Sequence, residues 1–395
     1  VEQMIRVAAG EKLPFNQADV RLDGWAMESR LYAEDPYRGF LPSIGRLTRY
    51  RPPAETEGYL PGHRPTAPII RNDTGVEEGG EISRFYDPMI AKLCTWGASR
   101  ADAIEGQRNA LDAFELEGIG HNLPFLAAVY DHPKFISGNI STAFIAEEYP
   151  DGFSGTSLSD ETLKQISEIC AMMQYVRDYR ALQVTGKVRP QTSDIHRPYL
   201  IEIASQQFQY TAIIEPEQYY RLSPDPGMVE YHYTLHDGTD AMTGNLAWKP
   251  GATLARRHGE PHREGDEGKG SYAEWDGPVL MCLKVEERTE GFRIRYRGAD
   301  LDVKVRSPRA AELAALMPEK EVADTSKMLL CPMPGVVVSL AVVEGEAVEE
   351  GQALCTVEAM KMENVLRAER KGTVRQINAE PGASLAVDDV IMEFE

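Results

Sequence analysis

The chain has 395 residues, of which 42% are hydrophobic and 26% charged, a balance typical of a soluble globular protein with two to four domains. A net charge of -20 argues against nucleic acid as a partner, because a phosphate-binding surface needs clustered Lys and Arg. No apolar stretch approaches the ~20 residues that span a bilayer, so no membrane partner is expected. The five scattered cysteines contain no CxxC pair, which favours reduced thiols over disulfides or a zinc site.

The first third of the chain predicts mixed strands and helices. Val1–Gly10 has the pattern of the end of a helix that Gly10 terminates, and no preceding segment is present for it to pack on. We therefore expect the first domain to be truncated at its N-terminus. Val20–Ala33 alternates like a pair of strands, and Asp102–Leu116 has apolar residues at helical spacing.

The middle region predicts one long helix followed by short strands. Apolar residues recur at helical spacing from Asp160 to Leu182. Six strand candidates separated by turns follow: Tyr199–Ala204, Tyr210–Ile214, Glu230–Leu235, Val279–Val285, Phe292–Tyr296 and Ala299–Val305. This order favours an antiparallel sheet or barrel around or beside the helix.

One stretch inside this region contains a possible metal-binding spacing. His258 and His262 have the His-x-x-x-His spacing of zinc ligands on a helix, but Gly259 and Pro261 exclude a helix there. We therefore interpret the acidic, glycine-rich stretch Arg256–Gly270 as a surface loop, and we expect no metal site in the chain.

The C-terminal region contains an internal repeat. Residues 335–358 match residues 372–395 at a constant offset of 37 without a gap, so that Gly335 pairs with Gly372 and Glu358 with Glu395. Each copy alone would expose an apolar face, which predicts that the two copies pack together as a flattened, two-fold symmetric β-sandwich. The turn after Glu358 would then project at the end opposite to the C-terminus.

The residues in this turn resemble a known sequence. Glu358-Ala359-Met360-Lys361-Met362-Glu363 is similar to the biotinylation sequence of the biotin-dependent carboxylases, and Cys331–Gly335 is similar to the segment that begins their biotin-carrying domain. The resemblance implies that a biotin protein ligase attaches biotin covalently to Lys361, and that the flanking methionines are adaptable contacts. A lipoyl carrier domain is the structural alternative, but a methionine on each side of the lysine favours biotin.

The first region resembles the C-terminal subdomain of the family's biotin carboxylase, an ATP-grasp enzyme. The similar segments are Trp25–Arg30, Ala33–Pro36, Leu41–Gly45 and Phe85–Leu93. By this resemblance Arg71 contacts the biotin ring and bicarbonate, where a fixed positive charge stabilises the ureido oxygen. Arg64 is close enough in the sequence to be an alternative. The family's ATP- and metal-binding residues precede this region, so neither site is expected in this chain.

Within the family, the chain most resembles the α-subunits that act on propionyl-CoA, through Ile140–Ile145 and Tyr149–Phe153. This resemblance implies ATP- and bicarbonate-dependent carboxylation of biotin, followed by carboxyl transfer to propionyl-CoA to give methylmalonyl-CoA. An α-subunit for methylcrotonyl-CoA or another acyl-CoA remains an alternative. A non-catalytic biotin or lipoyl carrier or scaffold protein remains a second alternative.

The resemblance also implies a multidomain α+β architecture. Its parts are a biotin carboxylase C-terminal subdomain (1–145), a connecting domain with a helix and barrel that binds a carboxyltransferase β-subunit (146–317), a linker (318–328) and a biotin carrier domain (329–395). We expect a large α/β hetero-oligomer in the bacterial cytoplasm or the mitochondrial matrix. ATP, bicarbonate and Mg or Mn would be used by the absent N-terminal part, so this chain alone is expected to be inactive.

Overall fold

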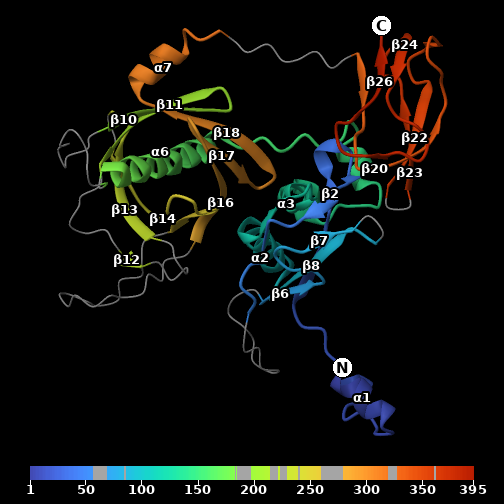
Figure 1. Cartoon of the computed structure of the whole chain (residues 1–395). Coiled ribbons are helices and arrows are strands. Elements are labelled where there is room, and N and C mark those ends of the chain that lie inside the picture. The colour runs from blue at the N-terminus through green and yellow to red at the C-terminus, as the bar shows by residue number, and fades with distance from the viewer. Residues whose placement is uncertain are drawn as a thin grey trace, which may run out of the picture.

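The computed structural model describes residues 1–56, 69–83, 86–182, 184, 197–213, 221–222, 229–238, 241–258, 279–318, 327–359 and 362–395. Its buried apolar side chains form three main clusters in chain order, within residues 31–130, 163–305 and 331–392. Each cluster belongs to a separate group of helices and strands in Figure 1. We call these groups the first unit, the barrel unit and the carrier unit.

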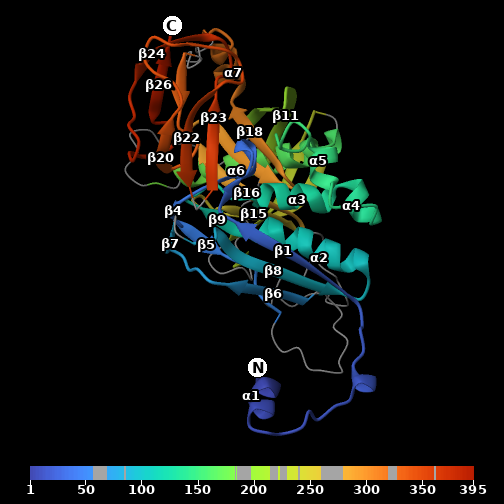
Figure 2. The same ribbon diagram turned by 90° about the vertical axis from the view of Figure 1, so that its right-hand side faces the viewer.

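The first unit is a three-stranded antiparallel sheet packed against a helix (Figure 2). The sheet order is β1-β8-β6, with β1 Trp25–Tyr32, β8 Met89–Gly97 and β6 Ile69–Thr74. Helix α2, Arg100–Ala113, buries Ile104 and Leu111 against this sheet. It begins at a capping box between Ser99 and Asp102 and ends where the chain becomes extended. The sheet therefore has one face against a core and one face turned away from it.

Short elements complete the first unit. They are α1 Glu2–Ala8, η1 Gln17–Asp19, β2 Glu34–Asp35, η2 Pro36–Arg38, β3 Leu41–Pro42, β4 Gly45–Arg46, β5 Arg49–Arg51, β7 Glu81–Ile82, β9 Glu115–Glu117, α3 Leu123–Asp131, α4 Pro133–Ser137 and α5 Phe144–Glu148. The predicted N-terminal helix is present as α1, which has no buried residue and lies apart from the sheet in Figures 1 and 2.

Two predictions for the first unit need correction. Val20–Ala33 is not a pair of strands, because only its second part is a strand and its partner is the distant β8. The residues before this strand form a connecting segment instead of a second strand. In this segment Gly24 has a φ of +74°, and the Trp96 indole donates a hydrogen bond to the carbonyl of Asp23. The predicted helix 102–116 ends earlier, at Ala113, because Glu115–Glu117 pairs with β5 as strand β9.

The barrel unit is a closed antiparallel sheet around one helix. Its strands are β10 Arg197–Ile203, β11 Gln206–Ile213, β12 Arg221–Leu222, β13 Val229–His236, β14 Ala241–Ala247, β15 Leu254–His258, β16 Val279–Arg288, β17 Gly291–Tyr296 and β18 Ala299–Arg306. The sheet order is β11-β10-β18-β17-β16-β15-β14-β13-β12, and pairing of β11 with β13 closes the barrel. Helix α7, Pro308–Ala314, follows and packs on β10 and β18.

Helix α6, Asp160–Leu182, lies inside this sheet, as Figure 1 shows. Every side chain from Ile166 to Met173 is buried, so the helix is covered on all sides rather than along one stripe. Its buried polar groups have partners: the Ser167 and Tyr210 hydroxyls are 2.9 Å apart, and Arg257 forms a 3.2 Å ion pair with Glu168. The predicted long helix with an antiparallel barrel is therefore confirmed.

Strands β14 and β15 were not predicted. The stretch Arg256–Gly270 was expected to be a loop, but Arg256–His258 forms the end of β15, and residues 259–270 lie outside the described residues. Strand β14 contains Gly244, which normally disfavours a strand. Here the glycine is required, because an added Cβ would lie 2.5 Å from the Tyr233 hydroxyl oxygen.

The carrier unit consists of two four-stranded sheets with the same internal order. One sheet has the order β23-β22-β20-β25, with β23 Met362–Arg367, β22 Ala353–Ala359, β20 Gly335–Leu340 and β25 Ser384–Leu385. The other has the order β19-β26-β24-β21, with β19 Met328–Leu330, β26 Val390–Phe394, β24 Gly372–Ile377 and β21 Ala347–Val348. Each sheet takes one short strand from the other copy of the repeat.

The backbone contacts follow the offset of 37 residues. The amide of Gly345 donates to the carbonyl of Val374, and its repeat mate Gly382 donates to Val337. Strands β20 and β24 begin and end at equivalent residues of the two copies. The predicted two-fold packing of the repeat is therefore present.

Candidate functional site: the β22–β23 hairpin

The biotinylation-like sequence lies on the hairpin that joins β22 to β23. Glu358 pairs with Glu363 and Ala359 with Met362, which leaves only the two residues Met360 and Lys361 to connect the strands. Both of these residues lie outside the described residues, and the side chain of Met362 is likewise not described. Two residues are the shortest length common for the connection of a β-hairpin.

The strands on either side of the connection are anchored in the carrier core. Val357 and Ala359 are buried, whereas Glu358 and Glu363 are exposed on the opposite face. This alternation is that of a strand with one side on a core. The hairpin therefore has a fixed base, with two carboxylates exposed beside the connection.

The Cys331–Gly335 segment contacts the strands that form the base of the hairpin. Met333 is 1% exposed, and its sulfur accepts a hydrogen bond from the Asn364 amide at 3.6 Å. The Cys331 thiol donates to the Met333 carbonyl at 3.0 Å. Cys331 and Cys355 are buried, as expected for small core residues. The sequence analysis missed the contribution of Met333 and Asn364, because their contact joins residues 31 positions apart.

The hairpin and the C-terminus lie at opposite ends of the carrier unit (Figure 1). This placement follows from the repeat, in which Glu358 and Glu395 are equivalent positions. The first copy continues into the β22–β23 connection, whereas the second copy stops at Glu395. The lysine-bearing turn thus has no chain terminus beside it.

The other predicted site residue, Arg71, lies on β6 in the first unit. Its side chain is 65% exposed and forms a 2.9 Å ion pair with Asp73. Across the sheet it is opposite Cys94, which is opposite Glu28 on β1, so the three lie in one row. This ion pair with Asp73 raises the pKa of the Arg71 guanidinium, which therefore stays charged.

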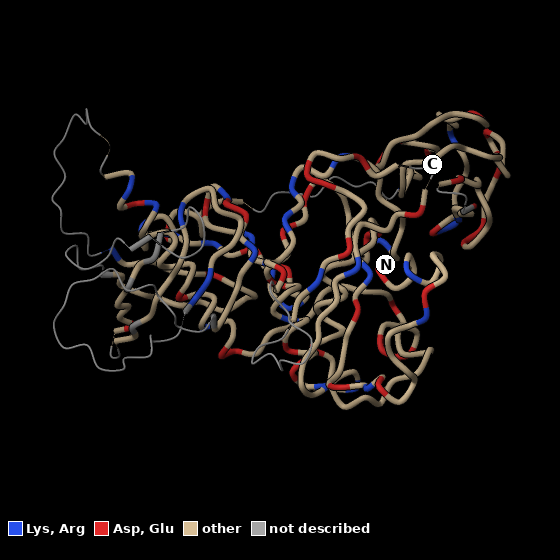
Figure 3. The backbone as a smooth tube through the Cα atoms, turned by 90° about the horizontal axis from the view of Figure 1, so that it is seen from below, with Lys and Arg blue, Asp and Glu red and all other residues tan. Residues whose placement is uncertain are grey.

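Arg71 and the hairpin belong to separate units. Within the described ranges, no hydrogen bond or ion pair joins Arg71 to residues 358–363. Arg64, the alternative to Arg71, lies outside the described residues. Figure 3 shows Lys and Arg interspersed with Asp and Glu along the backbone of both larger units.

Two further properties concern the whole described chain. Among these residues no group of three or more His, Cys, Asp or Glu side chains could hold a metal ion. None of the helices in the same ranges is long and apolar enough to cross a membrane.

Three protein-family models match separate parts of the chain. They are the biotin carboxylase C-terminal domain over residues 28–147, the propionyl-coenzyme A carboxylase BT domain over residues 271–320 and the biotin-requiring enzyme family over residues 327–394. The matches fall on the first, barrel and carrier units in that order. The C-terminal match includes the β22–β23 hairpin.

Curated relatives match along the whole chain. The propionyl-CoA carboxylase alpha chain of Ruegeria pomeroyi is 54% identical over 403 residues, covering 100% of this chain and 55% of the relative. The chain is a homologue of propionyl-CoA carboxylase alpha chains. The human mitochondrial propionyl-CoA carboxylase alpha chain is 34% identical over 411 residues, covering 100% of this chain and 49% of the relative. The chain thus spans about half the length of these relatives.

One solved structure is similar to part of the chain. It is the biotin carboxylase domain of the Hydrogenobacter thermophilus 2-oxoglutarate carboxylase, in complex with MgADP and bicarbonate. The sequences are 36% identical over 37% of this chain and 29% of the other, with a TM-score of 0.32. The homologues of the chain include a bacterial and a mitochondrial protein.

Proposed function

We propose that this chain is the biotin-carrying part of a propionyl-CoA carboxylase α-subunit, with biotin attached covalently to Lys361. The observation that carries the proposal is the hairpin register, which leaves Lys361 in a two-residue connection between anchored strands. An amine at such a position can enter the active site of a biotin protein ligase. Exposed Glu358 and Glu363 mark the strand ends beside it. Bound biotin would supply a nitrogen that carries a carboxyl group between two active sites.

We further propose that Arg71 contributes to the carboxylation site. Its exposed guanidinium can donate several hydrogen bonds from a fixed planar fork to an anion such as bicarbonate. Asp73 holds one side of that fork at 2.9 Å and leaves other donors available. ATP, bicarbonate and Mg or Mn would be bound by the longer protein to which this part belongs.

The unit boundaries belong to the same proposal. We place the biotin carboxylase C-terminal subdomain at 1–145, the connecting domain at 146–317, the linker at 318–328 and the carrier domain at 329–395. The three separate apolar clusters support this division. The connecting domain would bind a carboxyltransferase β-subunit in an α/β hetero-oligomer, located in the bacterial cytoplasm or the mitochondrial matrix.

The test is carboxylase activity of the complete α-subunit assembled with a β-subunit. We expect Lys361→Arg to abolish streptavidin binding and propionyl-CoA carboxylation, because a permanently protonated guanidinium cannot be acylated as a neutral amine is. The matched control is Lys371→Arg, at an exposed lysine of the same unit, which should retain both. Because arginine keeps the positive charge and nearly the length of lysine, the melting temperature and assembly should not change.

Three outcomes would contradict the proposal. Activity that survives Lys361→Arg would exclude this lysine as the attachment site. Preference for 3-methylcrotonyl-CoA over propionyl-CoA would favour the alternative α-subunit. Biotinylation without any carboxylation of either thioester would favour a carrier or scaffold role.

A further inference from the structure

The turn between β17 and β18 enters the first unit. Tyr296 pairs with Ala299, so Arg297 and Gly298 form a two-residue turn in which φ is +50° and +83°. A Cβ on Gly298 would lie 2.8 Å from the Cβ of Ala128 and 2.9 Å from the carbonyl oxygen of Pro124. Both of these residues belong to α3 of the first unit. The turn therefore fits against α3 only because position 298 has no side chain.

The Arg297 side chain forms a buried ion pair with the first unit. It is 9% exposed, and its Nε lies 2.6 Å from the Oδ2 of Asp112, whose side chain is 4% exposed. Its Nη2 donates to the Oδ1 of Asn109 at 3.0 Å. Asp112 and Asn109 both lie on α2. Removing Arg297 would leave Asp112 buried without its closest cationic partner.

Other polar contacts cross at the same place. The Lys284 ammonium of β16 donates to the Leu111 carbonyl at the C-terminal end of α2 at 2.7 Å, where a helix favours a positive charge. Within the proposed connecting domain, Thr156 also holds the turn, because it donates from its amide to the Gly298 carbonyl and from its hydroxyl to the Arg297 carbonyl.

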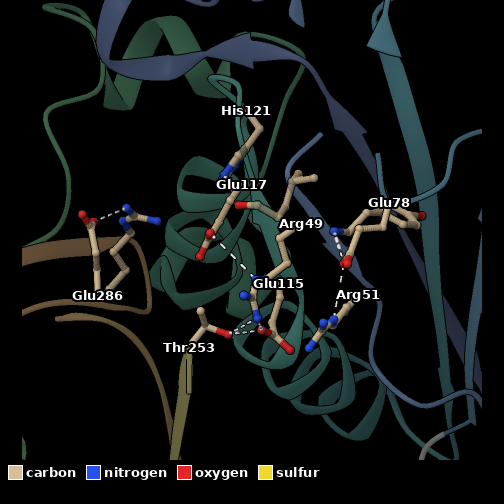
Figure 4. A network of polar contacts seen from close by, with 11 residues as sticks. Arg49, Arg51, Glu78, Glu115, Glu117, His121, Thr253 and Glu286 are labelled. Atoms are coloured by element: carbon tan, nitrogen blue, oxygen red, sulfur yellow. Dashed lines mark hydrogen bonds and ion pairs between the residues drawn. The ribbon is translucent and has the colours of Figure 1, made fainter. Parts of the chain in front are cut away.

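Arg49 adds a further crossing contact, shown in Figure 4. Its guanidinium bonds both Glu115 of its own unit at 3.2 Å and the Thr253 hydroxyl of the barrel unit at 3.1 Å. The interface thus contains polar contacts of Arg297, Lys284 and Arg49 that join the first unit to the barrel unit. Buried polar groups that pair across an interface favour a specific orientation, because few other arrangements pair them all.

The contact of the carrier unit with the first unit is of a different kind. Arg38 and Asp388 form an ion pair at 3.2 Å, with side chains 37% and 68% exposed. An exposed pair of this kind adds little stability and is screened by salt.

We propose that the β17–β18 turn locks the first unit and the barrel unit into one rigid body. The lock consists of Gly298 against α3 and of Arg297 with Asp112. Under the proposed function, it would keep the carboxylation site at a fixed distance from the β-subunit docking domain. The lock itself does not depend on that function.

The test is the distance distribution between two spin labels in the full chain, measured by electron paramagnetic resonance. Labels are placed at Ala101→Cys on α2 and Ala310→Cys on α7, both exposed, in a Cys94→Ser background because the other four cysteines are buried. We expect one narrow distribution for the otherwise unchanged chain. Arg297→Met and Asp112→Asn should each broaden it.

The matched control is Arg306→Met, at another poorly exposed arginine of the same hairpin. Arg306 pairs with Glu202 and Glu290, both within the barrel unit, so its loss should leave the distribution narrow. If circular dichroism shows that Arg297→Met does not fold, the test rests on Asp112→Asn, which keeps the side-chain shape. A broad distribution in the starting chain, or narrow ones in both lock variants, would overturn the proposal.

Discussion

His121 is a partly buried titratable residue of the first unit. Its Nε2 lies 3.1 Å from the Leu116 carbonyl oxygen, and its Nδ1 is buried without a hydrogen-bond partner among the described residues. Burial, followed by the positive charges of Arg295 and Lys284, lowers the pKa of this imidazole to about 4. The ring is therefore neutral at pH 7, with Nε2 as the donor.

This depressed pKa predicts loss of stability in mild acid. The unfolded chain binds a proton near pH 6.5, whereas the folded chain resists protonation down to about pH 4. The free energy of unfolding should therefore fall as the pH decreases through this window, by about 2 kcal/mol between pH 7 and pH 5. Urea titrations of the full chain at both values measure it. His121→Gln should reduce this pH dependence. An equal dependence in the two proteins would refute the assignment.

The neighbours of the two candidate site residues could be predicted only in part. The predictions for Lys361 and Arg71 rest on local sequence, because each lies within a contiguous segment similar to the family. The row of Arg71, Cys94 and Glu28 depends on the pairing of β1 with β8 and of β8 with β6. The incorrect strand pair at Val20–Ala33 concealed this pairing, since it assigned β1 a local partner.

At the scale of elements, the two copies of the carrier repeat differ at one equivalent glycine. A Cβ on Gly335 would lie 2.7 Å from both the Glu358 carbonyl oxygen and the Val357 Cγ1. A Cβ on its repeat mate Gly372 would meet its nearest atom, the Glu395 carbonyl oxygen, at 3.5 Å. Gly335 and Gly372 are therefore a matched pair of positions, of which only Gly335 lies against a strand of the biotinylation hairpin.

We expect Gly335→Ala to destabilise the carrier unit by roughly 1–3 kcal/mol, because backbone atoms of β22 must shift to accommodate the methyl group. Gly372→Ala should be neutral or slightly stabilising, since it removes unfolded-chain freedom without a clash. Thermal melts of the two variants measure the difference, and streptavidin blotting shows whether the hairpin still accepts biotin. Equal melting temperatures would show that Gly335 is not required for its close contact with β22.

Helices and strands that depend on residues nearby in the sequence were predicted better than those that depend on distant residues. Helix α6 was predicted from Asp160 to Leu182 with both ends correct, because its apolar residues recur over six turns. The repeat predicted the carrier strands, since each copy supports the other. Strand β14 was missed because its Gly244 is explained only by Tyr233 on the neighbouring strand. Elements that depend on a contact with a residue distant in the sequence could not be predicted from the local sequence pattern.

At the scale of the whole molecule, the described chain combines the first and barrel units, which contact each other at the β17–β18 turn, with a smaller carrier unit. The predicted linker, residues 318–328, lies mostly outside the described residues. Eleven residues span at most ~36–40 Å when extended, at ~3.3–3.6 Å each. Under the proposed function, the reach of Lys361 is therefore this span added to the length of the carrier unit. Tethering would keep its effective concentration high at both active sites.

The central claim is that Lys361 carries biotin. The most direct measurement is peptide mapping by mass spectrometry of the chain co-expressed with a biotin protein ligase. We predict the mass of one biotinyl group on the peptide that contains Lys361 and on no other, with the increment absent in Lys361→Arg. A lipoyl increment on that peptide, or a biotinyl group on a different lysine, would contradict the account.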